Sequence, residues 1–366
     1  MHLKFFIEKL VYLLMPNSRK LGDYKVESSI VNGPSNNMYI VCKNKKKYIA
    51  QCDGCAKGSK TFRFDVKIHE LLKKSNSSYF PQYVSSGFDG GIKFFVTELY
   101  GPSLRSILDE VNGKFSESDA LRIGYHLFMC IKALHQNAII HRDINPKNIV
   151  VSIQHDHPIK LTNFGASRIY MVQQKHSEER EFISFRGSSY EYASINAMKG
   201  KDVSRCDDLI SWFYVLSEML FGKLPWASLT DKEEILNQKI NFNFNLLYSE
   251  YPQLLEIWNS LQNLKFKDRP KYDYIENILK NVLREKALKF EESYVWEYKG
   301  LKLKVKNLPS LAMNQPEPIN LDTEFKEYSS SSRPAIMEKL RIKIPKIKSK
   351  EKKNFQPLLT SNELFF

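Results

Sequence analysis

The sequence has few cysteines, no long apolar run and no internal repeat. Its 366 residues include five cysteines, an odd number that does not suggest a disulfide framework. The apolar stretch at residues 5–15 is interrupted by Glu8 and Lys9, which argues against a secretory leader. It is also shorter than the roughly 20 apolar residues that a membrane span needs. No unit of about 20–50 residues recurs, which excludes solenoid and propeller folds. We therefore expect a soluble protein of the reducing cytoplasm or nucleus, with no transmembrane segment.

Two features near the N-terminus allow more than one interpretation. Within residues 1–22, apolar side chains recur at helical spacing, which predicts a helical extension docked on the following domain. Attachment of this helix to a membrane surface is the alternative. Cys52 and Cys55 have the spacing of half a zinc site, but no second Cys/His pair accompanies them. We interpret them as small residues of a loop.

Basic residues outnumber acidic residues in the sequence. The formal net charge is +14, and a field of this sign attracts nucleotides, acidic proteins, nucleic acids or lipid headgroups. Charge is dense at residues 339–353, where eight of the fifteen residues are Lys or Arg. We expect protein partners for the chain. For residues 339–353 we expect either contact with nucleic acid or an anionic membrane surface, or the plainer role of a solvated tail or nuclear-import signal.

The apolar periodicity changes near Gly101. Residues 23–101 contain short β-rich runs around one helical pattern at residues 62–74, which predicts a small sheet packed on a single helix. Residues 102–298 are mainly helical in period, whereas residues 299–366 lose periodicity and become rich in proline, serine and lysine. The pattern predicts an α+β protein with a small β-rich lobe, a larger helical lobe and an irregular basic tail.

Two motifs indicate a chemistry. Residues 141–148 read HRDINPKN, and Asn163-Phe164-Gly165 follow twenty residues later. The first resembles the catalytic loop of protein kinases, and the second stands where that family has Asp-Phe-Gly. Three further segments resemble the casein kinase I, tau-tubulin kinase and vaccinia-related kinase group: ELYGPSL at 98–104, SFRGSSYEYASINA at 184–197 and DDLISWFYVLSEMLFGKLPW at 207–226. The resemblance implies the bilobal protein kinase fold, with ATP and magnesium as cofactors.

Several positions that hold the phosphates in the family are altered. By resemblance, the glycines of the phosphate-covering loop fall on Val31, Gly33 and Asn36, so one glycine remains. The strand lysine that pairs with the phosphates falls on Cys52, and a shift of one residue would place Gln51 there. Lys43, on the preceding strand, is a substitute cation that could reach in from another direction.

The adenine end of the site is better preserved. By resemblance, Ala50 would cover the base, Thr97 matches the gatekeeper, and the hinge from Glu98 to Tyr100 would offer backbone hydrogen bonds. The family's helix glutamate maps to Asp65, and because no lysine remains to pair with it, we expect a solvated helix charge. ATP is a candidate cofactor whose binding stays open, since the same residue types would suit any packed strand.

The catalytic loop keeps some groups and loses others. The resemblance makes Asp143 the base for a substrate hydroxyl and Asn148 a metal ligand, but Asn145 stands where the family has a lysine. A loop aspartate can equally persist because it accepts backbone hydrogen bonds, so a structural role for Asp143 stays open. Asn163 can coordinate magnesium through its amide oxygen without adding negative charge, so we expect metal binding to be weak or absent.

The altered positions lead to two functional hypotheses. The first is a casein kinase I-like pseudokinase, an impaired kinase domain that serves as a binding or allosteric module. The alternative is an active, divergent serine/threonine kinase that transfers the γ-phosphate of ATP to protein hydroxyls through the retained Asp143 and Asn148. By resemblance, Glu191 replaces an arginine that in casein kinase I binds acidic or phosphate-primed substrates, and a carboxylate there would repel them.

Overall fold

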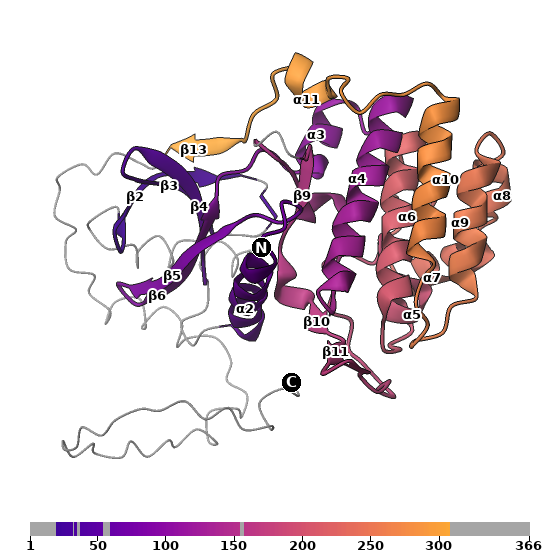
Figure 1. Ribbon diagram of the computed structural model, residues 1–366, viewed down its shortest axis with the longest axis horizontal. Helices are drawn as coiled ribbons and strands as arrows, with labels where there is room; N and C mark the ends of the chain where they lie inside the picture. The colour runs from indigo at the N-terminus through magenta and orange to yellow at the C-terminus, as the bar shows by residue number, and fades with distance from the viewer. Residues whose placement is uncertain (1–19, 32, 35–36, 54–58, 154–156, 308–366) are drawn as a thin grey trace, which may run out of the picture. The chain divides into compact units, whose positions relative to one another are not determined.

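A curled antiparallel sheet forms the first lobe (Figure 1). The computed structural model describes residues 20–31, 33–34, 37–53, 59–153 and 157–307. The sheet runs in the order β1-β2-β3-β4-β6-β5. Its strands are β1 Lys20–Leu21, β2 Tyr24–Ile30, β3 Met38–Lys43, β4 Lys46–Cys52, β5 Tyr83–Asp89 and β6 Ile92–Glu98.

Tight turns set the register of this sheet. Asn44 and Lys45 join β3 to β4, and both adopt the left-handed backbone of a two-residue hairpin turn, with φ of 53° and 63°. Because successive side chains of a strand point to opposite faces, this register decides which residues reach the second lobe. The other face holds the core of the first lobe, around Val26, Val41 and Phe94.

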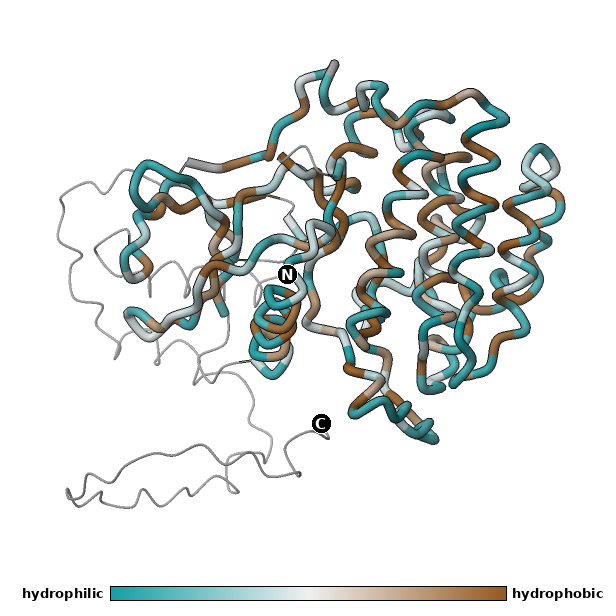
Figure 2. The backbone as a smooth tube through the Cα atoms, viewed as in Figure 1, coloured by the Kyte–Doolittle hydropathy of each residue, from teal (hydrophilic) through white to brown (hydrophobic). Residues whose placement is uncertain are grey.

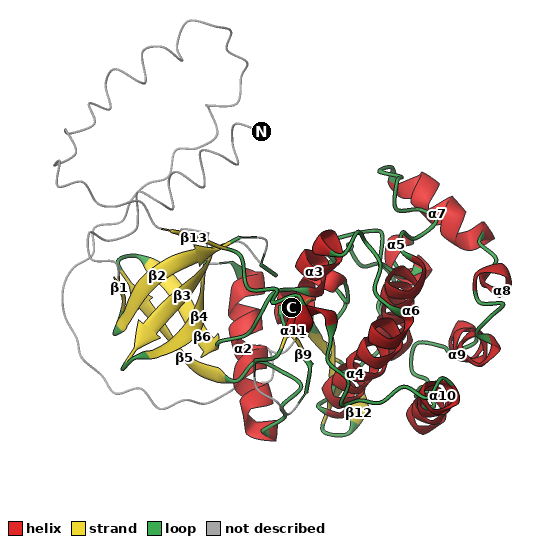
Figure 3. Cartoon of the chain, turned by 90° about the horizontal axis from the view of Figure 1, so that it is seen from above, coloured by secondary structure: helices red, strands yellow, loops and turns green. Residues whose placement is uncertain are grey.

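Helix α2, Lys60–Ser75, corresponds to the helical pattern predicted at residues 62–74. It begins at Ser59, whose side chain accepts the Phe62 N–H at 3.0 Å, and it ends at Asn76, whose left-handed backbone (φ 45°) stops the helix. Figure 3 shows α2 between the sheet and the helices of the second lobe. Its buried residues recur every three or four positions, so one face of α2 reaches the region where the lobes meet.

Helix α6, Arg205–Phe221, is the centre of the second lobe, and each of its residues from Arg205 to Leu220 is buried. Helix α4, Glu117–Gln136, lies so close to it that a Cβ added to Gly124 would be 2.7 Å from Leu216 Cδ1. Figure 2 shows hydrophobic and hydrophilic residues alternating along the helices of this lobe, as expected where one face is buried. The other helices are α3 Leu104–Glu110, α5 Ile195–Met198, α7 Lys232–Asn241, α8 Phe244–Leu247, α9 Pro252–Gln262, α10 Tyr272–Glu285 and α11 Val295–Tyr298.

Short strands and 3-10 turns between α4 and α5 carry the sequence motifs. They are β7 Ile139–Ile140, η1 Pro146–Asn148, β8 Ile149–Val151, β9 Ile159–Leu161, η2 Phe164–Ala166, β10 Arg168–Ile169, β11 Met171–Val172 and β12 Lys175–His176. They pair as small two-stranded sheets beside the helices. The two lobes confirm the predicted α+β, bilobal architecture.

A segment after the second lobe returns to the first. Strand β13, Val305–Asn307, pairs antiparallel with β2. Val31 N donates to Lys304 O at 2.9 Å, and Lys304 Nζ forms an ion pair with Glu110 of α3. Residues 299–307 therefore form a strap that holds the edge of β2 to the second lobe.

The strap corrects the prediction that an irregular tail begins at residue 299. Its backbone pairs with the sheet edge, and such pairing needs no apolar pattern that the sequence could reveal. Residues 1–19 of the predicted N-terminal extension and residues 308–366, including the basic stretch 339–353, lie outside the described residues. Within the described part of the chain, no helix combines the length and apolarity that crossing a membrane would require.

Deleting residues 301–366 removes β13, which pairs with Ser28–Ile30 of β2, whereas β1 still pairs with Tyr24 and Lys25. Within the peptide Tyr24–Val31, we expect amide hydrogens of residues 28–31 to exchange with deuterium at least about tenfold faster, since local opening there no longer breaks the pairing with β13. Hydrogen-exchange mass spectrometry measures this rate. The control is deletion of residues 310–366, which keeps the strap and should leave the rate unchanged. Equal protection of Tyr24–Val31 in both deletions would contradict a stabilising strap.

Candidate active site

The catalytic loop is anchored to the central helix of the second lobe. Asp208 of α6 accepts the backbone N–H of His141 at 2.7 Å and that of Arg142 at 2.8 Å, and His135 Nε2 lies 3.0 Å from the same carboxylate. Arg142 has a left-handed backbone, φ 66°, which is unfavourable for a residue with a Cβ. Burial alone would raise the pKa of Asp208, but the hydrogen bond from His135 helps to hold it below its ordinary value. These hydrogen bonds hold the backbone turn of the catalytic loop that positions Asp143.

The Asp143 carboxylate accepts hydrogen bonds on both oxygens. Oδ1 accepts the backbone N–H and the hydroxyl of Ser188 at 2.7 and 3.0 Å, and the Asn145 amide at 3.1 Å. Oδ2 accepts Asn148 Nδ2 at 2.9 Å. Burial raises the pKa of this carboxyl, whereas the hydrogen bonds from Ser188 favour its charged form. The structure therefore brings Asp143, Asn145 and Asn148 together, and it leaves both the catalytic and the structural role of Asp143 open.

Ser188 is a site residue that the motif analysis missed. It follows Gly187, where the family has threonine after the glycine, so the string GSSYEYAS contained the signal. A Cβ on Gly187 would lie 2.7 Å from the Phe185 ring and 3.2 Å from Asp143 Oδ1, so glycine allows this close approach. Asn145 Nδ2 also lies 3.2 Å from Ser188 Oγ. A neutral amide thus links the aspartate and the serine where the family has a lysine.

The two expected metal ligands bind each other. Asn163 Nδ2 donates to Asn148 Oδ1 at 2.9 Å, and Asn163 adopts a left-handed backbone (φ 67°) that asparagine tolerates. Magnesium favours carboxylate oxygens, and neither amide supplies a negative charge. The residues at these positions therefore do not fit the magnesium site that the kinase family implies.

Strand β4 presents Gln51, and not Cys52, at the position of the family's lysine. Ala50 and Cys52 point into the core of the first lobe, where burial raises the pKa of the Cys52 thiol to about 12. Ile49 and Gln51 lie on the opposite face and line a cavity between the lobes. The predicted placement was wrong by one residue, and because strand side chains alternate, that shift exchanges the two faces. Ile49 therefore takes the place expected for Ala50.

The cysteine pair considered as half a zinc site is only partly described. Cys52 is buried in the first lobe and is a free thiol, whereas Cys55 lies outside the described residues. Within the ranges that the structure describes, no three His, Cys, Asp or Glu side chains gather in a way that could hold a metal ion.

Asp65 of α2 is buried, which corrects the expectation of a solvated helix charge. Its Oδ1 accepts the Phe164 N–H at 2.8 Å, and its Oδ2 lies 3.5 Å from Gln51 Nε2. His69 Nε2 lies 3.6 Å from Oδ1. Burial raises the pKa of Asp65 to about 7, although the Phe164 hydrogen bond opposes this shift, and burial lowers the pKa of His69 to about 3. An amide and a buried carboxyl replace the family's lysine–glutamate pair.

Lys43 does not reach the cleft as a substitute cation. It ends β3, five residues beyond Met38, which lines the interlobe cavity, so about 17 Å of extended strand separates the two. Its Nζ pairs with Asp23 Oδ2 at 2.8 Å on the surface. Among the described residues the buried lysines are Lys160 and Lys239, and neither lines this cavity.

The side chains of the hinge make hydrogen bonds and packing contacts within the protein. Thr97 is buried, and its hydroxyl donates to the Glu98 carbonyl at 3.2 Å. The Glu98 carboxylate accepts Lys160 Nζ at 2.6 Å and the Gln82 N–H at 3.1 Å. Tyr100 turns its ring inward and is 3% exposed. The hinge thus contributes an aromatic side chain to the cleft.

The interlobe cavity is small. It holds at most about 180 Å³ of empty space and is lined by Met38, Ile49, Gln51, His69, Phe95, Thr97, Tyr100 and Thr162. Pockets that bury a drug-sized ligand measure about 300–1,000 Å³. Gly33, of the expected phosphate-covering loop, lies between residues outside the described ranges. With Tyr100 inside it, the cleft does not fit the adenine nucleotide that the family implies.

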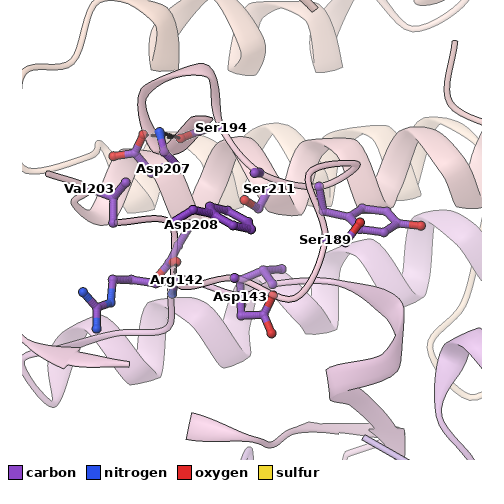
Figure 4. Close-up of a pocket in the computed structure, with 14 residues that line it drawn as sticks. Arg142, Asp143, Ser189, Ser194, Val203, Asp207, Asp208 and Ser211 are labelled. Atoms are coloured by element: carbon purple, nitrogen blue, oxygen red, sulfur yellow. Dashed lines mark hydrogen bonds between the residues drawn. The ribbon is translucent and has the colours of Figure 1, made fainter. Parts of the chain in front are cut away.

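A second hollow, whose empty space of about 320 Å³ includes open solvent, lies beside residues 184–197, which we call the activation segment (Figure 4). Its labelled lining residues are Arg142, Asp143, Ser189, Ser194, Val203, Asp207, Asp208 and Ser211. Asp207 accepts the Ser194 hydroxyl at 2.6 Å and the Ser204 N–H at 2.7 Å. Asp207 therefore fixes the starts of α5 and α6, and Asp208 holds the catalytic loop, so both carboxyls are engaged within the protein.

The end of the activation segment is held by a buried lysine. Lys239 Nζ donates to the carbonyls of Tyr190 and Ala193 at 2.7 and 2.6 Å. Burial raises the pKa of nearby Glu191, and the Glu218 charge adds to this shift. Glu191 is half-buried, so the residue at the family's substrate-binding arginine is partly withdrawn from solvent.

Replacing Asp65 by asparagine tests the cost of burying this carboxyl. Its folded pKa of about 7 exceeds the ordinary 3.8, so folding stability is greatest at low pH and falls as the pH rises through the folded pKa. The amide of Asp65→Asn keeps an oxygen for the Phe164 N–H and cannot ionise. We expect the variant to exceed wild type in free energy of unfolding by at most about 4 kcal/mol at pH 8.5, and the gain to vanish near pH 4. Urea unfolding at both pH values measures this.

The control for this test is Asp65→Ala. It leaves the Phe164 N–H without its partner and should lower the free energy of unfolding by about 1–3 kcal/mol at both pH values. If wild type and Asp65→Asn changed stability in parallel between pH 4 and 8.5, the carboxyl would not titrate in the folded chain as inferred.

Sequence comparisons with known proteins identify relatives of this chain. A model of the protein kinase domain matches residues 29–286. A probable serine/threonine-protein kinase of Dictyostelium discoideum is 31% identical over 240 residues, which cover 63% of this chain and 48% of that protein. The chain thus spans about half the length of this curated relative. The fold, the catalytic loop and these matches show that the chain belongs to the protein kinase family.

Proposed function

We propose that this chain is a casein kinase I-like pseudokinase that acts as a binding or allosteric module. One observation carries the proposal: Gln51, Asn145 and Asn163 place neutral amides where the family has charged groups. Phosphoryl transfer depends mainly on positioning and on electrostatic stabilisation of the transferring group. Losing one preorganised electrostatic contact commonly slows a reaction by about 10²–10³-fold. Losing several such contacts leaves little phosphotransfer.

The same amides preserve the arrangement of the site. Asn145 joins Asp143 to Ser188, Asn163 joins Asn148, and Gln51 reaches Asp65. These neutral contacts assemble the cleft from the chain's own groups, with no nucleotide charge to balance. A surface that keeps its form without ATP suits a protein-binding or allosteric role, which supports that part of the proposal.

The casein kinase I assignment rests on the motifs and on one local contact. Residues 194–196 read Ser-Ile-Asn, as in that group, where other kinases have Ala-Pro-Glu. Ser194 caps α5 by accepting the Ala197 N–H at 3.1 Å, and its hydroxyl donates to Asp207. The string thus has a structural task in this chain. Partner recognition by Glu191 would differ from that group's preference for acidic substrates, because a carboxylate there repels them.

An active, divergent serine/threonine kinase is the second candidate. It is favoured by the contact between Asp143 Oδ1 and the Ser188 hydroxyl, 3.0 Å, because a base must lie at this distance from a hydroxyl. The distant position of Lys43 weighs against it, because no described lysine lines the interlobe cavity at the place of the strand cation.

For residues 339–353 we propose an anionic partner, a nucleic acid or a membrane surface, in the cytoplasm or nucleus. The support is their charge, eight Lys or Arg in fifteen residues. Contacts of this kind weaken as salt rises.

Transfer of labelled phosphate from ATP tests the pseudokinase proposal. The purified full chain and its Asp143→Ala variant are incubated with magnesium or manganese, with casein, basic proteins or no added substrate. We expect equal background incorporation in both proteins, because the charges that stabilise the transfer are missing. An active casein kinase I serves as positive control. Incorporation that Asp143→Ala abolishes would overturn the proposal and favour the active kinase.

A further inference from the structure

We propose that Tyr100 is a built-in occupant of the nucleotide cleft: its ring takes the place of a purine between the lobes, so the wild-type chain binds no adenine nucleotide. This goes beyond the proposed loss of phosphotransfer, because a pseudokinase can still hold ATP. It also predicts a latent site, since removing the ring would open a pocket for a flat aromatic base.

The contacts of Tyr100 place its ring between both lobes. It packs in one cluster with Met38 and Ile49 of the first lobe and Val150 of the second. Ile49 stands at the strand position that would cover a base, and Val150 belongs to β8, which follows the catalytic loop. A planar ring held between these two strands fills the layer that a base would need.

The hydroxyl end of the Tyr100 ring is also held in place. Thr162, the residue before Asn163, lines the same cavity and forms a side-chain hydrogen bond with the Tyr100 phenol. Burial raises the pKa of this phenol, and the nearby Asp65 carboxyl adds to the shift. The side chain therefore spans the cleft from the hinge to the Asn163-Phe164-Gly165 segment.

The backbone after Tyr100 keeps the hinge close to the second lobe. Gly101 N donates to Val151 O at 2.8 Å, and Val151 N donates to Pro102 O at 2.9 Å. A Cβ on Gly101 would lie 3.1 Å from the Val151 Cβ, so the close approach needs glycine. With the hinge fixed on β8, the side chain one residue earlier is directed into the cleft. Rotating the Tyr100 side chain out of the cleft would expose a large apolar ring to solvent. This cost opposes displacement of the ring by a ligand.

Binding of adenosine to the full-length chain tests the proposal. Adenosine carries no phosphate and needs no metal, so its binding is independent of the missing charges. The proteins are wild type, Tyr100→Ala and, as matched control, Tyr100→Phe, which keeps the ring. Equilibrium dialysis measures the Kd, and the midpoint of thermal unfolding, Tm, is followed against adenosine concentration.

We expect no saturable binding and no change in Tm for wild type and Tyr100→Phe up to millimolar adenosine. Tyr100→Ala should have a lower Tm without ligand, bind adenosine at least about tenfold more tightly than wild type, and gain Tm with adenosine as mass action requires. If Tyr100→Ala does not fold, Tyr100→Leu still removes the ring with less loss of packing, and a smaller gain in adenosine affinity over wild type is expected of it.

Saturable adenosine binding by wild type would overturn the proposal, whatever the variants do. So would a folded Tyr100→Ala or Tyr100→Leu that binds adenosine no better than wild type. Neither result concerns phosphotransfer, so the pseudokinase proposal would remain even if a ligand displaces Tyr100. Phosphotransfer that depends on Asp143 would instead overturn both, because ATP must then enter the cleft.

Discussion

The hydrogen bond from the Phe164 amide to the Asp65 carboxyl joins the two lobes, and the form of the cleft depends on it. The Phe164 ring packs against His69 of α2 and His141 of the catalytic loop, with centroids 5.0 and 5.5 Å apart. Helix α2, the Asn163-Phe164-Gly165 segment and the catalytic loop are therefore one packed unit. Because burial raises the pKa of Asp65 to about 7, its carboxyl carries less negative charge at neutral pH than an ordinary aspartate. A kinase with a charged pair here stabilises two ions, whereas this chain stabilises a carboxyl that is partly protonated.

Stability and catalysis make different demands on the same positions. A hydrogen bond between neutral groups contributes about 0.5–1.5 kcal/mol to folding, and an amide can make such a bond. Electrostatic stabilisation of a phosphoryl group needs net charge, which an amide lacks. Gln51, Asn145 and Asn163 meet the first demand and fail the second. This explains how the catalytic geometry around Asp143 can remain while the chemistry is proposed to be lost.

The sequence predicted the bilobal fold, the segments of the site and the catalytic-loop residues, but not every side chain that enters the cleft. The catalytic loop and α2 were foreseen because fixed spacing and apolar period identify them directly. The face of β4 was not, because Gln51 and Cys52 are neighbours and only the pairing register decides between them. Asp65 could have been placed by the period of α2, since it shares a face with Phe62, Ile68 and Leu72. The inward turn of Tyr100 and the pairing of β13 depend on contacts between distant segments, which no local pattern records.

Three groups of the chain close the cleft from different sides. Asp65 holds α2 at the back, Tyr100 fills the space beside the hinge, and the strap of residues 299–307 holds β2 at its outer edge. A ligand shifts a conformational equilibrium only by the difference in its affinity for the two states. Because Tyr100 fills the cleft, a nucleotide has no affinity for this closed state. It would have to bind and stabilise an open state of the chain. A regulator that prefers the closed chain must therefore act on its outer surface, where the strap and the activation segment are accessible to a protein partner.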